Sequence, residues 1–353
     1  MASLTASVGP RCSPAELATL LGALEVRVTD LKVERRDVSL PDYPGGPRPS
    51  SVVHVSGPAA SGQSATGRGE HVAFTDAEHE EFAATMPKWF GASGQRASAQ
   101  RASGQRVRVD HAIGREVSLY GRAALEAALI DLGLRQAGLG LADLTGVRDV
   151  ALRFVVSLAT DREPLSAIAR VRAEGFTGDL KIDVDPSWND ATLAALAADP
   201  SIRIFDFKGK GDLALAKRLA AQSAQALFED PPSGFEDERG LVSRDSSLPD
   251  ADAVCRARAR GEAVNLKAPR MGGPLELLRG LEGALAPRAG IAPVIAYLGG
   301  MFEVSVGRTQ ARQLAALYCA SGPNDLAPNL AGAEPRQNSP VLVRLDQPGF
   351  GGD

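Results

Sequence analysis

Residues 224–232 read AQALFEDPP, a short apolar run that ends in two acidic residues and two prolines. Six further apolar runs lie on either side of it, and Ala-, Leu- and Arg-rich segments with helical patterning follow them. These runs are VALRFVVSLA (150–159), LKIDVD (180–185), IRIFDFKG (202–209), LVSRDSS (241–247), AVNLKAP (263–269) and PVIAYLGG (293–300). Such alternation predicts an α/β fold with a parallel sheet.

The number of repeats favours a closed barrel over an open sheet. A weaker run, LAALYCASG (314–322), supplies a candidate eighth strand. Seven or eight strand–helix units are many for an open doubly wound sheet, and no GxGxxG turn joins a strand to a helix here. We therefore predict a TIM-like (β/α) barrel over residues 147–330, followed by a tail at 331–353.

The first 146 residues are organised differently. Leucines recur at helical spacing within residues 1–24, and the patterning indicates an antiparallel meander after them. The meander consists of a strand at 25–38, a Pro/Gly loop at 41–50, a strand at 51–57 and a turn at 67–72 (GRGEHV).

Two further segments complete this N-terminal region. Residues 92–106 (ASGQRASAQRASGQR) form a low-complexity repeat without an apolar face, so we expect an exposed insertion. Residues 118–138 place their apolar side chains on one broad face and predict a helix.

Composition excludes several classes of protein. The 353 residues carry 39 basic and 43 acidic side chains, and the net charge of -4 gives no electrostatic case for nucleic-acid binding. No run is long and apolar enough for a membrane span, and three scattered cysteines offer neither a disulfide framework nor a metal knuckle. We expect a cytoplasmic globular protein with no nucleic-acid or membrane partner; an oligomer is left open.

Charged and polar residues close the predicted strands. In a (β/α) barrel the carboxyl ends of the strands form one face, where the chemistry takes place. The residues at these ends are Lys181 with Asp183, Asp206 with Lys208, Glu229, Asp245, and Asn265 with Lys267. A single aspartate there would be read as a helix cap, but carboxylates on three consecutive strands, flanked by lysines, indicate a site.

The residue types indicate metal-assisted proton abstraction. Carboxylates at Asp206, Glu229 and Asp245 suit a hard divalent ion, Mg²⁺ with Mn²⁺ as the alternative, and the lack of histidine after residue 111 disfavours zinc. Such an ion can bind a substrate carboxylate and stabilise the enediolate formed when its α-proton leaves. A lysine can act as the base if its pKa is lowered from its usual value.

Four motifs resemble the enolase superfamily, specifically its muconate-lactonizing subgroup. They are ALFEDPP (226–232), VNLKAPRMGG (264–273), YLGGMFEVSVGR (297–308) and SGPNDLAP (321–328). The likeness is greatest to o-succinylbenzoate synthases, N-acylamino acid racemases and dipeptide epimerases, and it covers residues 175–328 well. It implies a modified (β/α)7β barrel with an N-terminal α+β capping domain, here residues 1–146, to which the tail returns.

The resemblance places residues in roles. Asp206, Glu229 and Asp245 fall on the metal-ligand positions, and Lys267 falls on the acid/base lysine of the sixth strand. Lys181 opens the family's KxK motif on the second strand.

Three residues depart from the family pattern. Asp183 replaces the second lysine of the KxK motif, Lys208 stands where asparagine is usual, and Ser246 stands where an acidic residue often follows the fifth-strand ligand. Lys208 could take over the role of the missing lysine, or it could be an exposed loop residue. Lys181 could instead simply neutralise Asp183 or Asp206.

Further residues are candidates for substrate binding. Asn265, Glu303 and Asp325 lie at the ends of the later strands. Glu303 could orient Lys267, contact substrate or make a structural hydrogen bond. The loops at 41–50 and 67–72 are expected to set specificity.

The functional hypothesis is a Mg²⁺-dependent isomerase or lyase acting on a small carboxylate substrate. Racemisation or epimerisation needs a second acid/base opposite Lys267, supplied by Lys181 or Lys208, whereas elimination or cycloisomerisation can run with one lysine. The alternative is a carboxylate-binding homologue that has lost proton transfer.

Overall fold

The computed structural model describes residues 10–38, 47–89, 106–114, 117–158, 163–287, 290, 292–326 and 339–352. Of the loop predicted at 41–50, residues 41–46 lie outside these ranges, as does the repeat at 92–106 apart from Arg106. The prediction is wrong for residues 48–50, which begin the strand β3 (Arg48–Pro58).

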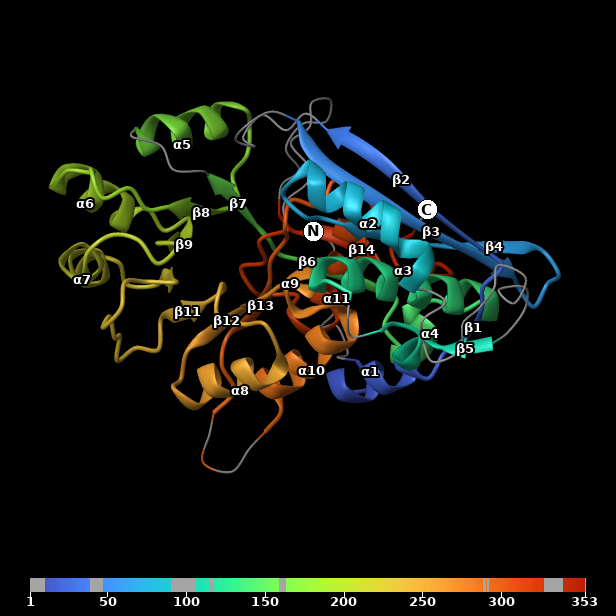
Figure 1. The fold of residues 1–353 in the computed structure, drawn as a ribbon. Coiled ribbons are helices and arrows are strands. Elements are labelled where there is room, and N and C mark those ends of the chain that lie inside the picture. The colour runs from blue at the N-terminus through green and yellow to red at the C-terminus, as the bar shows by residue number, and fades with distance from the viewer. Residues whose placement is uncertain are drawn as a thin grey trace.

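A curled, seven-stranded parallel sheet forms the larger part of the molecule (Figure 1). Its strands lie side by side in sequence order, which confirms the α/β barrel-like fold predicted from the apolar runs. They are β7 (Val155–Leu158), β8 (Asp179–Asp183), β9 (Ile202–Asp206), β10 (Leu227–Glu229), β11 (Val242–Arg244), β12 (Ala263–Leu266) and β13 (Ala296–Leu298).

The two edges of this sheet are joined by residues 324–325. The amide of Val155 donates to the carbonyl of Asn324 (2.9 Å), and the amide of Asp325 donates to the carbonyl of Leu298 (2.8 Å). The prediction that the run LAALYCASG (314–322) forms the eighth strand is wrong. It forms the end of a helix, α11 (Val306–Tyr318), because its apolar residues continue a buried helical face.

Helices on the outside of the sheet follow the strands, as Figure 1 shows for α5 to α8. They are α5 (Pro164–Ala173), α6 (Asp190–Ala198), α7 (Leu213–Gln222), α8 (Ala251–Ala259), α9 (Ala268–Met271), α10 (Pro274–Leu285) and α11. Side chains alternate along a strand, so Phe205 and Phe228 pack with buried residues of the outer helices, whereas Ile204 and Leu227 belong to a separate small cluster inside the barrel.

The run VALRFVVSLA forms two strands rather than one. Its first part is β6 (Asp149–Leu152), which pairs antiparallel with β14 (Val341–Arg344) near the C-terminus. Only the second part, β7, enters the barrel sheet.

The N-terminal region contains a three-stranded antiparallel sheet, ordered β2-β3-β4, packed on a long helix. Its elements are α1 (Pro14–Gly22), β1 (Glu25–Arg27), β2 (Asp30–Val38), β3 (Arg48–Pro58), β4 (Ser64–His71), α2 (Asp76–Trp89), β5 (Arg106–Arg108), a 3-10 turn η1 (Val109–His111), α3 (Leu119–Ala137) and α4 (Leu141–Thr145). The helix predicted at 118–138 is confirmed as α3. The strand predicted at 25–38 is divided, since β1 pairs with β5 instead.

The turn predicted at 67–72 is wrong: GRGEHV lies within and just beyond β4. Its glycines serve close packing, because a Cβ on Gly69 would lie only 1.9 Å from the carbonyl oxygen of Ala124 in α3. The absence of side chains at Gly67 and Gly69 therefore lets α3 lie directly against the strand.

The α+β region is tied to the barrel by polar contacts. Glu70 on β4 accepts hydrogen bonds from the backbone of residues 304, 305 and 307. The carboxylate of Glu126 on α3 accepts from the amide of Leu275 at the start of α10 (2.8 Å). Arg48 donates to the carbonyl of Met301 (3.1 Å). Within the residues described, no helix has the length and apolarity to cross a membrane.

Candidate active site

The carboxyl ends of the barrel strands bring the predicted site residues together. Asp206 is the register partner of both Asp183 and Glu229, so these three carboxylates lie at one level of adjacent strands. Leu180 and Ile182 pack toward the outer helices, and alternation along β8 therefore turns Lys181 and Asp183 to the inside. Asp245 directly follows β11, and Lys267 directly follows β12.

Lys181 lies where several of these carboxylates converge. Its Nζ is 2.5 Å from Glu229 Oε1, 3.0 Å from Asp206 Oδ2 and 3.2 Å from Asp325 Oδ2. Its side chain is only 3% exposed. Burial opposes the charged form, but the carboxylates of Glu229, Asp325 and Asp206 outweigh it and hold the pKa of Lys181 well above its usual value.

Glu229 has donors on both carboxylate oxygens. Tyr297 donates its hydroxyl to Oε2 (2.6 Å), and Asn265 donates its amide to the same oxygen (3.2 Å). Ser243 Oγ lies 2.8 Å from the Tyr297 hydroxyl. Burial raises the pKa of Glu229 to about 7, although Lys181 opposes this shift. Tyr297 was not singled out from the sequence, where it stands inside an otherwise apolar run.

Lys208 contacts the same oxygen of Asp206 as Lys181 does and also reaches Asp183. Its Nζ lies 2.8 Å from Asp206 Oδ2 and 3.2 Å from Asp183 Oδ1, while 49% of its side chain is exposed. Its backbone adopts a positive φ of 51°, and its amide donates to Asp206 Oδ1 (3.0 Å). Burial alone would raise the pKa of Asp206, but Lys181 and Lys208 hold it below its usual value. Burial raises the pKa of Asp183.

Asp245 is held by two cations and by Asp230. Lys267 Nζ lies 2.8 Å from Asp245 Oδ2, and Arg270 pairs with Oδ1. The carboxylate of Asp230 accepts from the amides of Asp245 (3.0 Å) and Ser246 (2.8 Å), which fixes the chain after β11. Lys267 and Arg270 outweigh the effect of burial and lower the pKa of Asp245.

The three candidate substrate-binding residues have different surroundings. Asp325 contacts Lys181, and Asn265 contacts Glu229. The amide oxygen of Asn265 is buried and has no hydrogen-bond partner in the described part of the chain. Glu303 accepts from the amide of Met301 (2.9 Å), a local structural contact.

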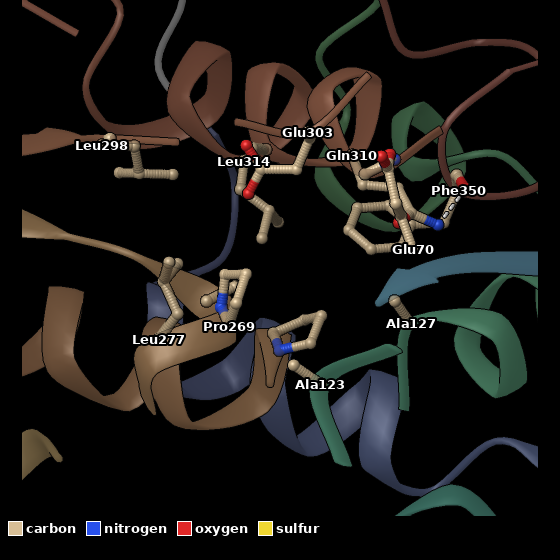
Figure 2. A pocket seen from close by; sticks show the side chains of 15 residues that line it. Glu70, Ala123, Ala127, Pro269, Leu277, Leu298, Glu303, Gln310, Leu314 and Phe350 are labelled. Atoms are coloured by element: carbon tan, nitrogen blue, oxygen red, sulfur yellow. Dashed lines mark hydrogen bonds between the residues drawn. The ribbon is translucent and has the colours of Figure 1, made fainter. Parts of the chain in front are cut away.

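A small cavity lies between helix α3 and the barrel, beside Pro269 (Figure 2). Its volume is about 30 Å³ and most of its lining is apolar, from residues such as Ala127, Pro269 and Leu314. Glu70 and Glu303 add two buried carboxylates. A space of this size holds one or two waters.

The donor set fits a hard divalent ion. Asp206, Glu229 and Asp245 supply carboxylate oxygens, which Mg²⁺ prefers, and the Lys181 ammonium shows that a cation is stabilised beside two of them. Among the described residues, no group of three His, Cys, Asp or Glu side chains is placed to hold a metal ion as the site stands. Metal binding would therefore require these side chains to rearrange.

Two family profiles match the chain. They are described as Domain of unknown function (DUF8230) N-terminal domain, over residues 19–144, and Domain of unknown function (DUF8230) C-terminal domain, over residues 148–331.

Two curated relatives have related names. An N-succinylamino acid racemase from Thermus thermophilus is 29% identical over 58% of this chain, and the match spans 59% of the racemase. A hydrophobic dipeptide epimerase from Roseobacter litoralis is 29% identical over 69% of this chain and 75% of its own length.

Solved structures share the fold. An enolase-superfamily member from Listeria innocua aligns with a TM-score of 0.70 at 18% identity, covering 92% of this chain and 94% of its own. Muconate lactonizing enzymes have the same fold. The resemblance inferred from the motifs is thus confirmed. The chain belongs to the DUF8230 family and has the fold of the enolase superfamily.

Proposed function

We propose that this protein is an isomerase that removes and returns the proton α to the carboxylate of a small substrate. The names of the racemase and epimerase relatives support an isomerase-type reaction, and the observation that carries the proposal is Lys267 at the end of β12, beside a cluster of carboxylates. The same names support a substrate class of N-acylated amino acids or dipeptides.

The charge of the site supports a divalent ion in the working enzyme. The ion pairs described at the strand ends contain four cations (Lys181, Lys208, Lys267 and Arg270) and five carboxylates (Asp183, Asp206, Glu229, Asp245 and Asp325). Carboxylates thus outnumber cations in these ion pairs, which disfavours a carboxylate substrate on its own. One Mg²⁺ or Mn²⁺ would offset this negative charge.

Asp206, Glu229 and Asp245 are the residues proposed to hold this ion. When bound, a divalent ion supplies positive charge for the substrate carboxylate as negative charge develops on it.

Lys267 is the proposed acid/base. Its side chain is 9% exposed, and Asp245 holds its ammonium at 2.8 Å. Gly299 makes room for it, because a Cβ there would lie 2.6 Å from Lys267 Cε. The lysine therefore runs along the backbone of the seventh strand's end and is kept at the barrel mouth, where it can take the α-proton and give it back.

Lys208 is the better placed of the two candidates for a second acid/base. Lys181 is buried and engaged by three carboxylates, whereas Lys208 is half exposed and bound only at its end by Asp183 and Asp206. Asp183, in the position of the lost KxK lysine, would then act by holding Lys208. Two bases on opposite faces would allow racemisation or epimerisation.

Deuterium exchange tests the proposal. N-succinylamino acids and hydrophobic dipeptides are incubated with the protein and Mg²⁺ in D₂O, and loss of the Cα proton signal is followed by NMR. We expect exchange with the wild type, none with Lys267→Met, and unchanged exchange with Lys217→Met, an exposed lysine on α7. Tight binding of these carboxylates without any exchange by the wild type would favour the carboxylate-binding alternative.

A further inference from the structure

The ammonium of Lys181 occupies an unusual place among the proposed metal ligands. It contacts Glu229 Oε1 at 2.5 Å and Asp206 Oδ2 at 3.0 Å, and all three side chains are at most 4% exposed. Among the described ion pairs at the strand ends, Lys208 reaches a single proposed ligand, Asp206, and Lys267 likewise reaches only Asp245. Lys181 alone in this set bridges two.

We propose that Lys181 is an internal counter-ion that holds Asp206 and Glu229 together without metal and competes with the divalent ion for them. This inference rests on the metal site of the proposed function and concerns the regulation of that site.

The contacts of Glu229 make the competition direct. Its Oε2 is engaged by Tyr297 and Asn265, so Oε1 is the oxygen left for a cation. Lys181 already contacts Oε1. A Mg²⁺ ion needs its carboxylate oxygens at roughly 2.0–2.1 Å, and an ammonium and a metal on the same oxygen repel each other. The two cations therefore compete for this oxygen.

The ammonium also has a partner outside the proposed ligand set. Asp325 Oδ2 lies 3.2 Å from Lys181 Nζ and comes from the segment that joins the two edges of the barrel sheet. A displaced ammonium can keep this contact, so metal binding need not leave a buried charge unpaired. Without metal, the ammonium spares Asp206 and Glu229 the repulsion of two buried, adjacent carboxylates.

The test compares Lys181→Met with a matched variant, Lys208→Met, which also removes one positive charge that contacts Asp206. Mg²⁺ and Mn²⁺ affinities are measured by calorimetry, and melting temperatures are measured in EDTA and in saturating Mg²⁺. We expect Lys181→Met to melt lower than the wild type in EDTA and to bind either ion about tenfold more tightly. Lys208→Met should change the affinity less, since its side chain is half exposed and touches one ligand.

Lys181→Gln serves if Lys181→Met is not recovered folded, because its amide can still donate to Glu229 while the charge is gone. Unchanged or weaker metal binding by the Lys181 variants would overturn the inference, as would an equal gain in Lys208→Met. In those cases the metal site itself stands. If neither the wild type nor any variant binds a divalent ion, the metal site of the proposed function fails, and this inference fails with it.

Discussion

Glu70 provides the most direct test of how the α+β region and the barrel are joined. Its carboxylate accepts from Val304 N (2.7 Å), Ser305 N (3.0 Å), Ser305 Oγ (2.8 Å) and Gly307 N (3.0 Å), all at the start of α11. Ser50 on β3 supplies a fifth hydrogen bond (2.9 Å). The side chain is buried, so Glu70→Ala leaves these donors without partners.

The cost follows from the number of donors lost. An unsatisfied buried donor costs roughly 1–3 kcal/mol, and four of these donors belong to the barrel. At about 1 kcal/mol each, Glu70→Ala should lower the free energy of unfolding by about 4 kcal/mol. Glu70→Gln should also be destabilising, because its amide group would face donors in place of one oxygen.

Urea unfolding of the wild type, Glu70→Ala and Glu70→Gln measures this effect. Glu80→Ala, at an exposed position on α2, is the matched control and should stay within about 0.5 kcal/mol of the wild type. If Glu70→Ala lowered the free energy of unfolding by less than about 1 kcal/mol, the hydrogen bonds between the α+β region and the barrel would contribute little to stability.

Two further predictions concern the packing and the polar contacts of α3. Gly69→Ala should cost about 3 kcal/mol in urea unfolding, because its Cβ would lie 1.9 Å from the carbonyl oxygen of Ala124; near-wild-type stability would mean that α3 can move away from β4 without loss. Burial raises the pKa of Glu126 to about 7, so the folded protein binds the proton more tightly than the unfolded chain does. Wild-type stability should therefore fall as pH rises from about 4.5 to 7, by up to about 3 kcal/mol relative to Glu126→Gln. Unfolding of both proteins at pH 5 and pH 8 checks this, and an equal pH dependence in both would contradict it.

The barrel and its polar strand ends could be predicted from the sequence because both depend on local pattern. Each apolar run ends in its own charged residue, and parallel strands place those ends on one face. This reasoning brought Lys181, Asp206, Glu229 and Lys267 to one site, where the structure also places them. The ion pairs could not be predicted from the sequence, because the order of the strands sets the height of a side chain in the barrel but not which side chain it contacts.

The errors arose where partners are distant in sequence. β6 pairs with β14, nearly two hundred residues later, so a local pattern cannot separate it from β7. Glu70 was overlooked because its flanking glycines suggested a turn. The signal that could have found it is the length of the hairpin: a strand at 48–58 needs a partner of similar length, and residues 64–71 supply one.

The N-termini of two barrel helices take part in the contact with the α+β region. α6, α7 and α8 accept the first-turn amide with their own N-cap side chains, Asn189, Asp212 and Asp250. α5 and α9 have no such side-chain hydrogen bond, and neither do α10 at Gly273 and α11 at Ser305.

The α+β region supplies hydrogen-bond acceptors to α10 and α11. Glu126 accepts from Leu275 at the start of α10, and Glu70 accepts from the residues that begin α11. α10 follows β12 and the short helix α9, a segment that contains Lys267 and Arg270, and α11 follows β13 and the segment that contains Glu303. Free helix N-termini carry unpaired donors and partial positive charge, so each attracts a carboxylate. The α+β region is thereby fixed to the two segments beside the proposed base.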